Sequence, residues 1–325
     1  MPASPPEFVS VIIPVYNGER FIADTVNAVL RQSRAPDEIV IVNDGSSDGT
    51  LARLAPFGDA IRVISIPNGG VSNARNTGIA ASRGSIIAFL DADDLWEPNK
   101  LEVQLAGLAA FPEVGFTCCN FNNVHADTHV VVPHLAYLKA NPHLRLDMPM
   151  PAPLLALINS NFVGTCSNVL VRRSVLDATG PFDTGYRQSE DYDLWLRCAM
   201  RTPFLFTSQP LMSKVAHDTN LTNNFVETLQ YHEKILEHLL TLPQIRQDPA
   251  LVREVGVALA RTRYHMGELR FNDGDVGSCM RYFRSALAAQ RTPKNLLKFL
   301  NVTARKSIRL ALRSLGVRLP ARQGN

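Results

Sequence analysis

The sequence of 325 residues contains little that marks a secreted, zinc-stabilised or membrane-spanning protein. Its five cysteines are scattered and form no CxxC pair, so we expect free thiols in a reducing compartment, with neither a disulfide framework nor a structural zinc site. The N-terminal residues show no basic region followed by an apolar stretch, which argues against a secretory signal. The longest uncharged run, 148–171, is interrupted by prolines and asparagines and predicts no spanning helix. These absences predict a cytoplasmic protein.

The net charge of +3 is small, but it is unevenly distributed along the chain. Residues 291–325 hold nine Lys and Arg and no Asp or Glu, whereas residues 1–290 hold 24 basic against 30 acidic residues. An acidic body with a basic tail argues against a nucleic-acid partner. Residues 304–320 place apolar side chains on one helical face and arginines on a neighbouring face. This pattern favours peripheral contact with the inner face of the cell membrane over a solvated helix packed on the helical region.

Short apolar runs rich in β-branched residues alternate with helix-period segments along the first 110 residues. The runs 8–13, 39–42, 61–66 and 85–90 predict strands, and 71–81 and 99–110 predict helices. Such alternation is typical of βαβ units, so we expect an α/β fold with a Rossmann-like, mostly parallel sheet and helices on both faces. Strands at 114–121, 130–132, 165–171, 204–206 and 211–216 and a helix at 191–200 complete this part.

From residue 221 onward the hydrophobic period is helical. Residues 260–293 follow the spacing of one tetratricopeptide-type helix hairpin. Because a single repeat leaves its own apolar face uncovered, we expect this appendage to pack on the α/β body. The sequence therefore predicts two domains, an α/β domain over 1–220 and an all-α region with the basic tail over 221–325.

Polar clusters follow four of the predicted strands, at 14–17, 44–48, 68–75 and 91–94. Ligands bind beyond the carboxyl ends of parallel strands, so we expect these clusters to form one site rather than ordinary solvated turns. Asp91 and Asp93 form a DxD motif, whose two carboxylates can reach one hard divalent cation and its neighbouring diphosphate. The adjacent Asp94 is either an alternate ligand or a cap of the following segment, and we favour the cap.

Five segments in order resemble the family 2 glycosyltransferases of the GT-A fold: VSVIIPVYNGERFI, IVNDGSSDGT, GVSNARNTGI, FLDADDLW and SEDYDLWLR. The resemblance covers roughly residues 8–220, and the ordered set is specific although each piece alone is not. It implies a metal-dependent, inverting glycosyltransferase of the hexosyltransferase type. Such an enzyme moves a sugar from a nucleotide-sugar donor, here expected to be UDP-linked, to a hydroxyl of a glycan or lipid-linked acceptor in surface polysaccharide synthesis.

The resemblance also implies roles for residues on the donor side. Asp44 accepts from the uracil ring, and Pro14, Val15 and Tyr16 line the base pocket. Arg75 reaches the phosphates of the nucleotide, with a plain surface arginine as the alternative.

The same resemblance places the cofactor and the acceptor chemistry. Asp93 is a ligand of Mn²⁺ or Mg²⁺, Asp91 lies near the ribose or the metal, and His217 meets the metal or the diphosphate unless it is merely structural. Asp191 is the general base for the acceptor hydroxyl, and Glu190 orients the acceptor or supports the loop. The alternative for this acidic pair is the charge preference of a helix N-terminus.

Two other classes of function remain open from the sequence. A sugar nucleotidyltransferase would also use a parallel sheet and metal carboxylates, but it would carry a Gly-rich, Arg- or Lys-bearing loop after the first strand, where this chain has PVYN over 14–17. A non-catalytic nucleotide-sugar or protein-binding module would tolerate loss of the DxD motif or of the Glu–Asp pair, and both are present.

Overall fold

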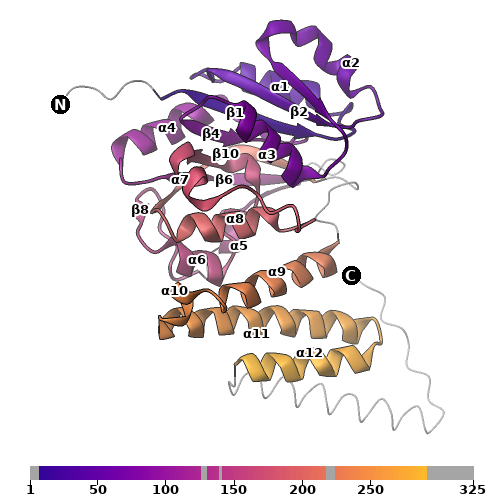
Figure 1. The fold of residues 1–325 in the computed structure, drawn as a ribbon, viewed down its shortest axis with the longest axis vertical. Helices are drawn as coiled ribbons and strands as arrows, with labels where there is room; N and C mark the ends of the chain where they lie inside the picture. The colour runs from indigo at the N-terminus through magenta and orange to yellow at the C-terminus, as the bar shows by residue number, and fades with distance from the viewer. Residues whose placement is uncertain (1–6, 126–129, 139–140, 217–223, 291–325) are drawn as a thin grey trace. The chain divides into compact units, whose positions relative to one another are not determined.

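The computed structural model describes residues 7–125, 130–138, 141–216 and 224–290. His217 and the predicted amphipathic segment 304–320 lie outside these residues. The chain folds as two compact units, Met1–Asn223 and Asn224–Asn325. Figure 1 shows the sheet and its covering helices in the first unit and the helices of the described part of the second unit.

The first four long apolar runs form one half of a ten-stranded sheet, with the strand order β3-β2-β1-β4. All four strands run parallel, and every side chain of β1 and β4 is buried, as expected for parallel strands covered on both faces. Val11 of β1 pairs with Ile39 of β2, and Ile12 pairs with Phe89 of β4. The strands are β1 (Val9–Val15), β2 (Glu38–Asp44), β3 (Arg62–Ile66) and β4 (Ile86–Phe89).

The sheet continues from β4 in the order β9-β6-β10-β5. Strand β9 is antiparallel to both of its neighbours, whereas β6 and β10 are parallel to each other, so the sheet is mixed but mostly parallel, as predicted. The edge strands β5, β7 and β8 are antiparallel additions. The strands are β5 (Leu95–Trp96), β6 (Phe116–His125), β7 (Val131–Pro133), β8 (Pro149–Met150), β9 (Leu170–Arg172) and β10 (Phe204–Ala216).

Two of the predicted strand boundaries are wrong. The predicted strands 204–206 and 211–216 are one strand, β10, whose pairing with β6 shifts register on both sides of Pro210. Proline has no N–H for the ladder and is tolerated in a strand at such bulges. The predicted strand 165–171 begins instead with the short 3₁₀ helix η2 (Cys166–Asn168), and only its end joins the sheet.

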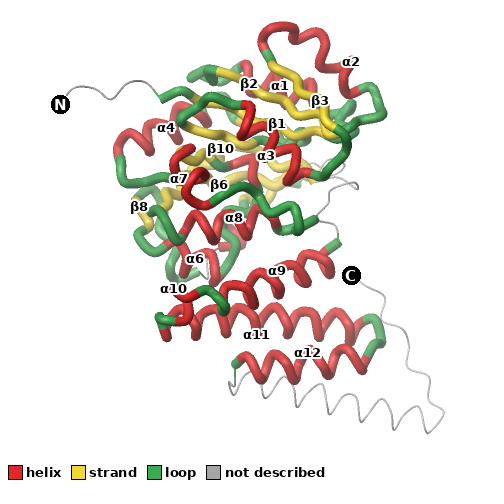
Figure 2. Tube along the Cα trace, viewed as in Figure 1, coloured by secondary structure: helices red, strands yellow, loops and turns green. Residues whose placement is uncertain are grey.

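Helices cover both faces of the sheet, which Figure 2 shows as red tubes around yellow strands. On one face, Val11 and Ile13 of β1 share a cluster with Val26 of α1 and Leu101 of α4. On the other face, α3 lies so close that a Cβ on Gly78 would stand 2.4 Å from Cγ2 of Ile12. The helices are α1 (Ile22–Leu30), α2 (Thr50–Leu54), η1 (Ala55–Ala60), α3 (Val71–Ala81), α4 (Lys100–Ala110), α5 (Leu135–Leu138), α6 (Pro153–Asn159), α7 (Arg173–Thr179) and α8 (Glu190–Ala199).

Aromatic rings fix α8 on the same face as α3. Trp195 of α8 is fully buried, with its ring centroid 5.0 Å from Phe116 of β6, 6.2 Å from Phe89 of β4 and 6.1 Å from Phe182. Such contacts anchor α8 to the sheet, including β4, whose end carries the DxD motif.

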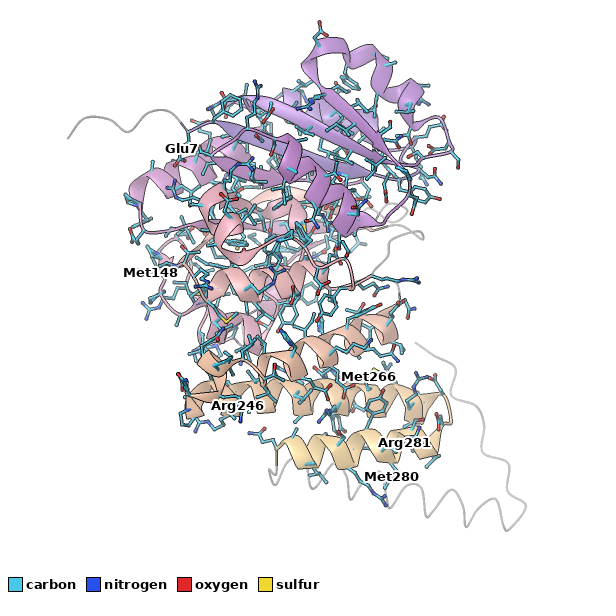
Figure 3. All side chains as sticks on the ribbon, in the orientation of Figure 1. Glu7, Met148, Arg246, Met266, Met280 and Arg281 are labelled. Carbon is cyan, nitrogen blue, oxygen red and sulfur yellow. The ribbon has the colours of Figure 1, made fainter. Side chains whose placement is uncertain are left out.

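The second unit is helical wherever it is described, with α9 (Phe225–Leu239), α10 (Pro243–Arg246), α11 (Pro249–Asn272) and α12 (Val276–Ala289). Gly274, at φ 81°, turns the chain between α11 and α12, and Asp275 caps α12 by accepting from the Ser278 N–H at 3.0 Å. Met280 packs against the cluster that joins the two helices, which Figure 3 shows with the side chains drawn. No helix in the described ranges combines the length and the hydrophobicity that a bilayer crossing requires. All five cysteines are buried, and none of them forms a disulfide.

Candidate functional site

The end of β1 and the end of β2 form one side of the site. Pro14 and Val15 are buried, while the next residue, Tyr16, is 55% exposed and open to a ligand. Asn17 adopts a left-handed conformation (φ 50°), and its Oδ1 accepts from the Ser47 N–H at 2.8 Å. This contact brings the predicted base-pocket residues of β1 beside the loop that follows β2.

Asp44, the last residue of β2, is 3% exposed and holds a second loop in place. Its Oδ1 accepts from the Gly69 N–H at 2.8 Å and its Oδ2 from the Gly70 N–H at 2.9 Å, at the start of α3. A carboxylate has about four lone-pair positions, so Asp44 keeps acceptor capacity for a further donor such as a base N–H.

The DxD motif follows β4 and is oriented by η2. The Asp91 N–H donates to the Ser167 hydroxyl at 3.0 Å, and the Thr165 hydroxyl donates to Asp91 Oδ2 at 3.4 Å. Asp93 is half-buried. Two carboxylates of the motif therefore lie at the rim of the sheet where a ligand can reach them.

Asp94 is neither an accessible ligand nor a helix cap, so the predicted cap is wrong. It is 2% exposed, accepts from the Ser167 hydroxyl at 2.5 Å and from the Val215 N–H at 3.2 Å, and lies well before the N-cap of α4, Asn99. Burial, followed by the charges of Asp93 and Asp91, raises the pKa of Asp94 to about 8. It joins the end of β4 to β10.

The donor set at this rim fits a hard divalent cation. Asp91 and Asp93 supply carboxylate oxygens, and Mg²⁺ or Mn²⁺ is commonly held by one or two carboxylates together with substrate phosphates and water. Within the described ranges, no group of three His, Cys, Asp or Glu side chains converges tightly enough to hold a metal unaided. His217, the third predicted ligand, lies outside those ranges.

Arg75 lies in the second turn of α3 and is 4% exposed, so the alternative of a plain surface arginine is wrong. Its Nη2 is 2.7 Å from Asp91 Oδ1 and its Nη1 is 2.6 Å from Glu190 Oε1. The guanidinium carbon lies 5.3 Å from the centre of the Phe182 ring. One side chain thus links the DxD motif to the Glu–Asp pair.

Glu190 and Asp191 open α8 after Ser189, which adopts a left-handed conformation at φ 63°. Asp191 Oδ1 accepts from the Tyr192 N–H at 2.7 Å. Burial raises the pKa of both carboxyls, against the opposing effect of the Arg75 charge. A carboxylate with a raised pKa is suited to accept a proton from a substrate hydroxyl.

The structure therefore brings Arg75, Asp91, Glu190 and Asp191 together. It connects them to Asp44 through α3, since Gly70 and Arg75 are five residues apart, or about 7.5 Å along a helix. The sequence patterns did not indicate Thr165 and Ser167, which orient Asp91. The polar residues Thr165, Ser167 and Asn168, which begin the predicted strand, were the available signal.

Lys214 of β10 was also missed. Its charge lowers the pKa of Asp94 and of Asp191, which places it in the electrostatic neighbourhood of both carboxyls. A lysine inside a predicted strand is usually read as a solvated side chain, so its position could be found only from the fold.

Comparison with known proteins identifies related sequences. The family model described as Glycosyl transferase family 2 matches residues 10–180. An uncharacterised glycosyltransferase of Rickettsia typhi is 30% identical over 231 residues, which is 70% of this chain and 70% of the relative. The UDP-Glc:α-D-GlcNAc-diphosphoundecaprenol β-1,3-glucosyltransferase WfgD of Escherichia coli is 32% identical over 195 residues, covering 58% of this chain and 68% of the relative.

Solved structures share the fold at low sequence identity. Residues 1–349 of S. aureus TarS, crystallised with UDP-GlcNAc, superpose with a TM-score of 0.65 at 17% identity, covering 86% of this chain and 81% of that one. The mannosyltransferase PcManGT of Pyrobaculum calidifontis, solved with GDP-Man and Mn²⁺, gives a TM-score of 0.61 at 17% identity, covering 95% and 83%.

Proposed function

The chain belongs to glycosyltransferase family 2, and from that membership we propose that it transfers one sugar from a UDP-linked donor to a hydroxyl of a glycan or lipid-linked acceptor, with inversion at the anomeric carbon. The observation that carries this proposal is the Arg75 bridge, which brings the DxD aspartate Asp91 and the acidic pair at Glu190 into one site. Direct transfer requires the motif that binds the donor and the base that deprotonates the acceptor to lie in the same site.

The names of related proteins support the two substrate classes. TarS was crystallised with UDP-GlcNAc, and WfgD acts on a diphosphoundecaprenol-linked sugar. Asp44 and the exposed ring of Tyr16 offer an acceptor and a stacking face at the end of β1 and β2, which suits a nucleotide base. A lipid-linked acceptor of the kind that WfgD uses would assign the enzyme to surface polysaccharide synthesis.

The residues divide into a donor side and an acceptor side. Asp44, with Pro14, Val15 and Tyr16, would bind the uracil, and Asp93 with Asp91 would hold Mn²⁺ or Mg²⁺. A cation held there would supply positive charge to neutralise the charge that develops on the leaving diphosphate.

On the acceptor side, Asp191 would take the proton of the acceptor hydroxyl. The hydroxyl oxygen then forms its bond to the anomeric carbon while the bond from that carbon to the diphosphate oxygen breaks. This is a single displacement, and it inverts the configuration. The raised pKa of Asp191 matches this role as a base.

The test is thermal unfolding with a panel of UDP- and GDP-sugars, with and without Mn²⁺ or Mg²⁺, followed by transfer assays with the stabilising donor. A ligand at 100 times its Kd stabilises the fold by about 2.7 kcal/mol. We expect one UDP-sugar to raise Tm in a metal-dependent manner, and Asp93→Ala to abolish that shift. If no nucleotide sugar stabilises the folded protein, the proposal is wrong and the binding-module alternative takes its place.

We propose further that residues 1–220 are the catalytic domain and that the basic segment 304–320 contacts the inner face of the membrane. Nine basic residues without an acidic one over 291–325 support this contact. Flotation with anionic liposomes would test it on the full chain, on the chain cut at residue 290, and on a full-length variant with Arg305, Arg309 and Arg313 changed to Gln. Equal flotation of all three would contradict the proposal.

A further inference from the structure

We infer that Arg75 is a positioning residue, which aligns the Glu190–Asp191 pair with Asp91 and does not act as a ligand of the donor phosphates. The inference rests on the proposed function, because it assigns Asp91 to the donor and Asp191 to the acceptor. It departs from the role that the family resemblance implied for this residue.

The guanidinium is already committed on three sides. Nη2 pairs with Asp91 at 2.7 Å, Nη1 pairs with Glu190 at 2.6 Å, and the Phe182 ring lies 5.3 Å from the guanidinium carbon. The remaining Nε is buried and has no hydrogen-bond partner within the described ranges. Because the side chain is 4% exposed and both of its terminal nitrogens are paired, a phosphate would have to enter the buried site and compete with these two carboxylates for the cation.

The neighbouring residue on α3 holds the same segment. Asn76 Nδ2 donates to the Phe182 carbonyl at 2.8 Å, and the Phe182 N–H donates to Asn76 Oδ1 at 2.9 Å. Two consecutive residues of α3 therefore hold the segment that leads into α8 at both of its ends: Asn76 binds the backbone of Phe182, and Arg75 pairs with Glu190. The left-handed Ser189 then directs the first turn of α8.

This arrangement sets the distance between Asp91 on the donor side and the Glu190–Asp191 pair on the acceptor side. Asp91 lies just after β4, Glu190 opens α8, and within the described residues Arg75 of α3 is the side chain that forms an ion pair with both. A shift of about 1 Å between reacting groups can cost roughly 100-fold in rate. Loss of the bridge should therefore lower kcat while the groups that bind the nucleotide stay in place.

The charge of Arg75 has a second effect on the base. It opposes the burial that raises the pKa of Glu190 and Asp191. The other charged groups that act on Asp191 are Lys214, which lowers its pKa, and Asp91, which raises it. Removing the guanidinium should move the acid limb of the kcat profile to higher pH, a change that a merely structural arginine would not produce.

The experiment compares Arg75→Gln and Arg75→Lys with a matched control, Arg173→Gln. Arg173 is partly buried, but it donates to the carbonyls of Gly84, Ile79 and Ser82, and within the described residues it pairs with no carboxylate. For each full-length protein, calorimetry gives the Kd of UDP with Mn²⁺, and transfer assays give kcat, KM and the pH profile.

For Arg75→Gln we expect kcat to fall about 100-fold or more, with the Kd of UDP changed less than about threefold. Arg75→Lys should recover at least tenfold of that loss, because it keeps the charge. Arg173→Gln should lower Tm and leave kcat within about threefold. If Arg75→Gln does not fold, Arg75→Lys and Asn76→Ala decide the question in the same assays. Both should lower kcat without raising the Kd of UDP.

The inference is overturned if Arg75→Gln raises the Kd of UDP tenfold or more while kcat at saturating donor is unchanged. It is also overturned if the Arg75 and Asn76 variants that fold keep the wild-type kcat and pH profile. A wild-type chain that binds no nucleotide and transfers no sugar would instead refute the proposed function. The two failures are therefore distinguishable.

Discussion

Asp191→Asn separates the proposed base from every other feature of the site. The substitution keeps the size of the side chain and its place in the first turn of α8, but an amide does not accept a proton from a hydroxyl. Asp193→Asn is the matched control, because Asp193 lies in the same turn and its Oδ2 instead accepts from Arg197 Nε at 2.9 Å and Nη2 at 2.8 Å.

The expected magnitude follows from the role of a general base. Such a group contributes about 10² to 10⁴ in rate, so kcat of Asp191→Asn should fall by that factor, or about 2.7–5.5 kcal/mol of activation free energy. The Kd of the nucleotide should change little, since Asp191 is assigned to the acceptor. Asp193→Asn should lower Tm and leave kcat nearly unchanged.

The pH dependence has a definite sign. The base works only when it is ionised, and burial raises the pKa of Asp191, so kcat of the wild type should rise with pH along an acid limb above the usual range for aspartate. Because the folded state favours the protonated form, the same raised pKa makes this carboxyl lower the stability of the fold as pH rises through that window. Asp191→Asn should therefore not lose stability at neutral pH.

The assay measures initial transfer rates at saturating donor from pH 4 to 9, together with Tm for each protein. Wild-type kcat in Asp191→Asn would refute the assignment of the base. A rate loss in Asp193→Asn as large as that in Asp191→Asn would also count against it, because the effect would then belong to the helix turn rather than to one carboxylate.

Three further substitutions test other parts of the reasoning. Asp44→Ala removes two hydrogen bonds to backbone N–H groups, so calorimetry should show UDP binding weakened about tenfold and urea unfolding a loss of about 1–3 kcal/mol; unchanged UDP affinity would contradict the base pocket. Burial lowers the pKa of Lys100 to about 8, so unfolding free energy should rise with pH from about 8 to 10.5 by roughly 3 kcal/mol, and Lys100→Met should remove that slope. Gly78→Ala would bring a Cβ to 2.4 Å from Cγ2 of Ile12, so it should lower stability by about 1–3 kcal/mol, and an unchanged Tm would show that α3 can move away.

Local patterns predicted the first half of the fold well, for a physical reason. Parallel strands buried on both faces are short continuous apolar runs, and the helix predicted at 71–81 matches α3 (Val71–Ala81) because its pattern is local. The mostly parallel sheet and the helices on both faces are confirmed. The irregular part was harder, since Pro210 reads as a break although β10 passes through it with bulges.

Part of the site followed from the same logic. The rule that ligands bind beyond the carboxyl ends of parallel strands predicted that the end of β2 and the end of β4 would face one site. The prediction that Asp94 is a cap was wrong because an aspartate after a strand has the local pattern of a cap. In the fold, Asp94 instead accepts hydrogen bonds from the Ser167 hydroxyl and from the β10 backbone. Its partners lie 73 and 121 residues away, beyond the reach of any local pattern.

Arg75 shows where sequence reasoning ends and what the fold adds. In GVSNARNTGI it stands in a polar helix start, which favours either a phosphate ligand or a solvated side chain. Its two partners lie 16 and 115 residues away, one after a parallel strand and one at the start of a helix on the same face of the sheet. Burial of a cation between them is tolerable only because both carboxylates are present together. Under the roles proposed for Asp91 and Asp191, the distance between the donor and acceptor sides is therefore set by Arg75, a residue on a third element that need not touch either substrate.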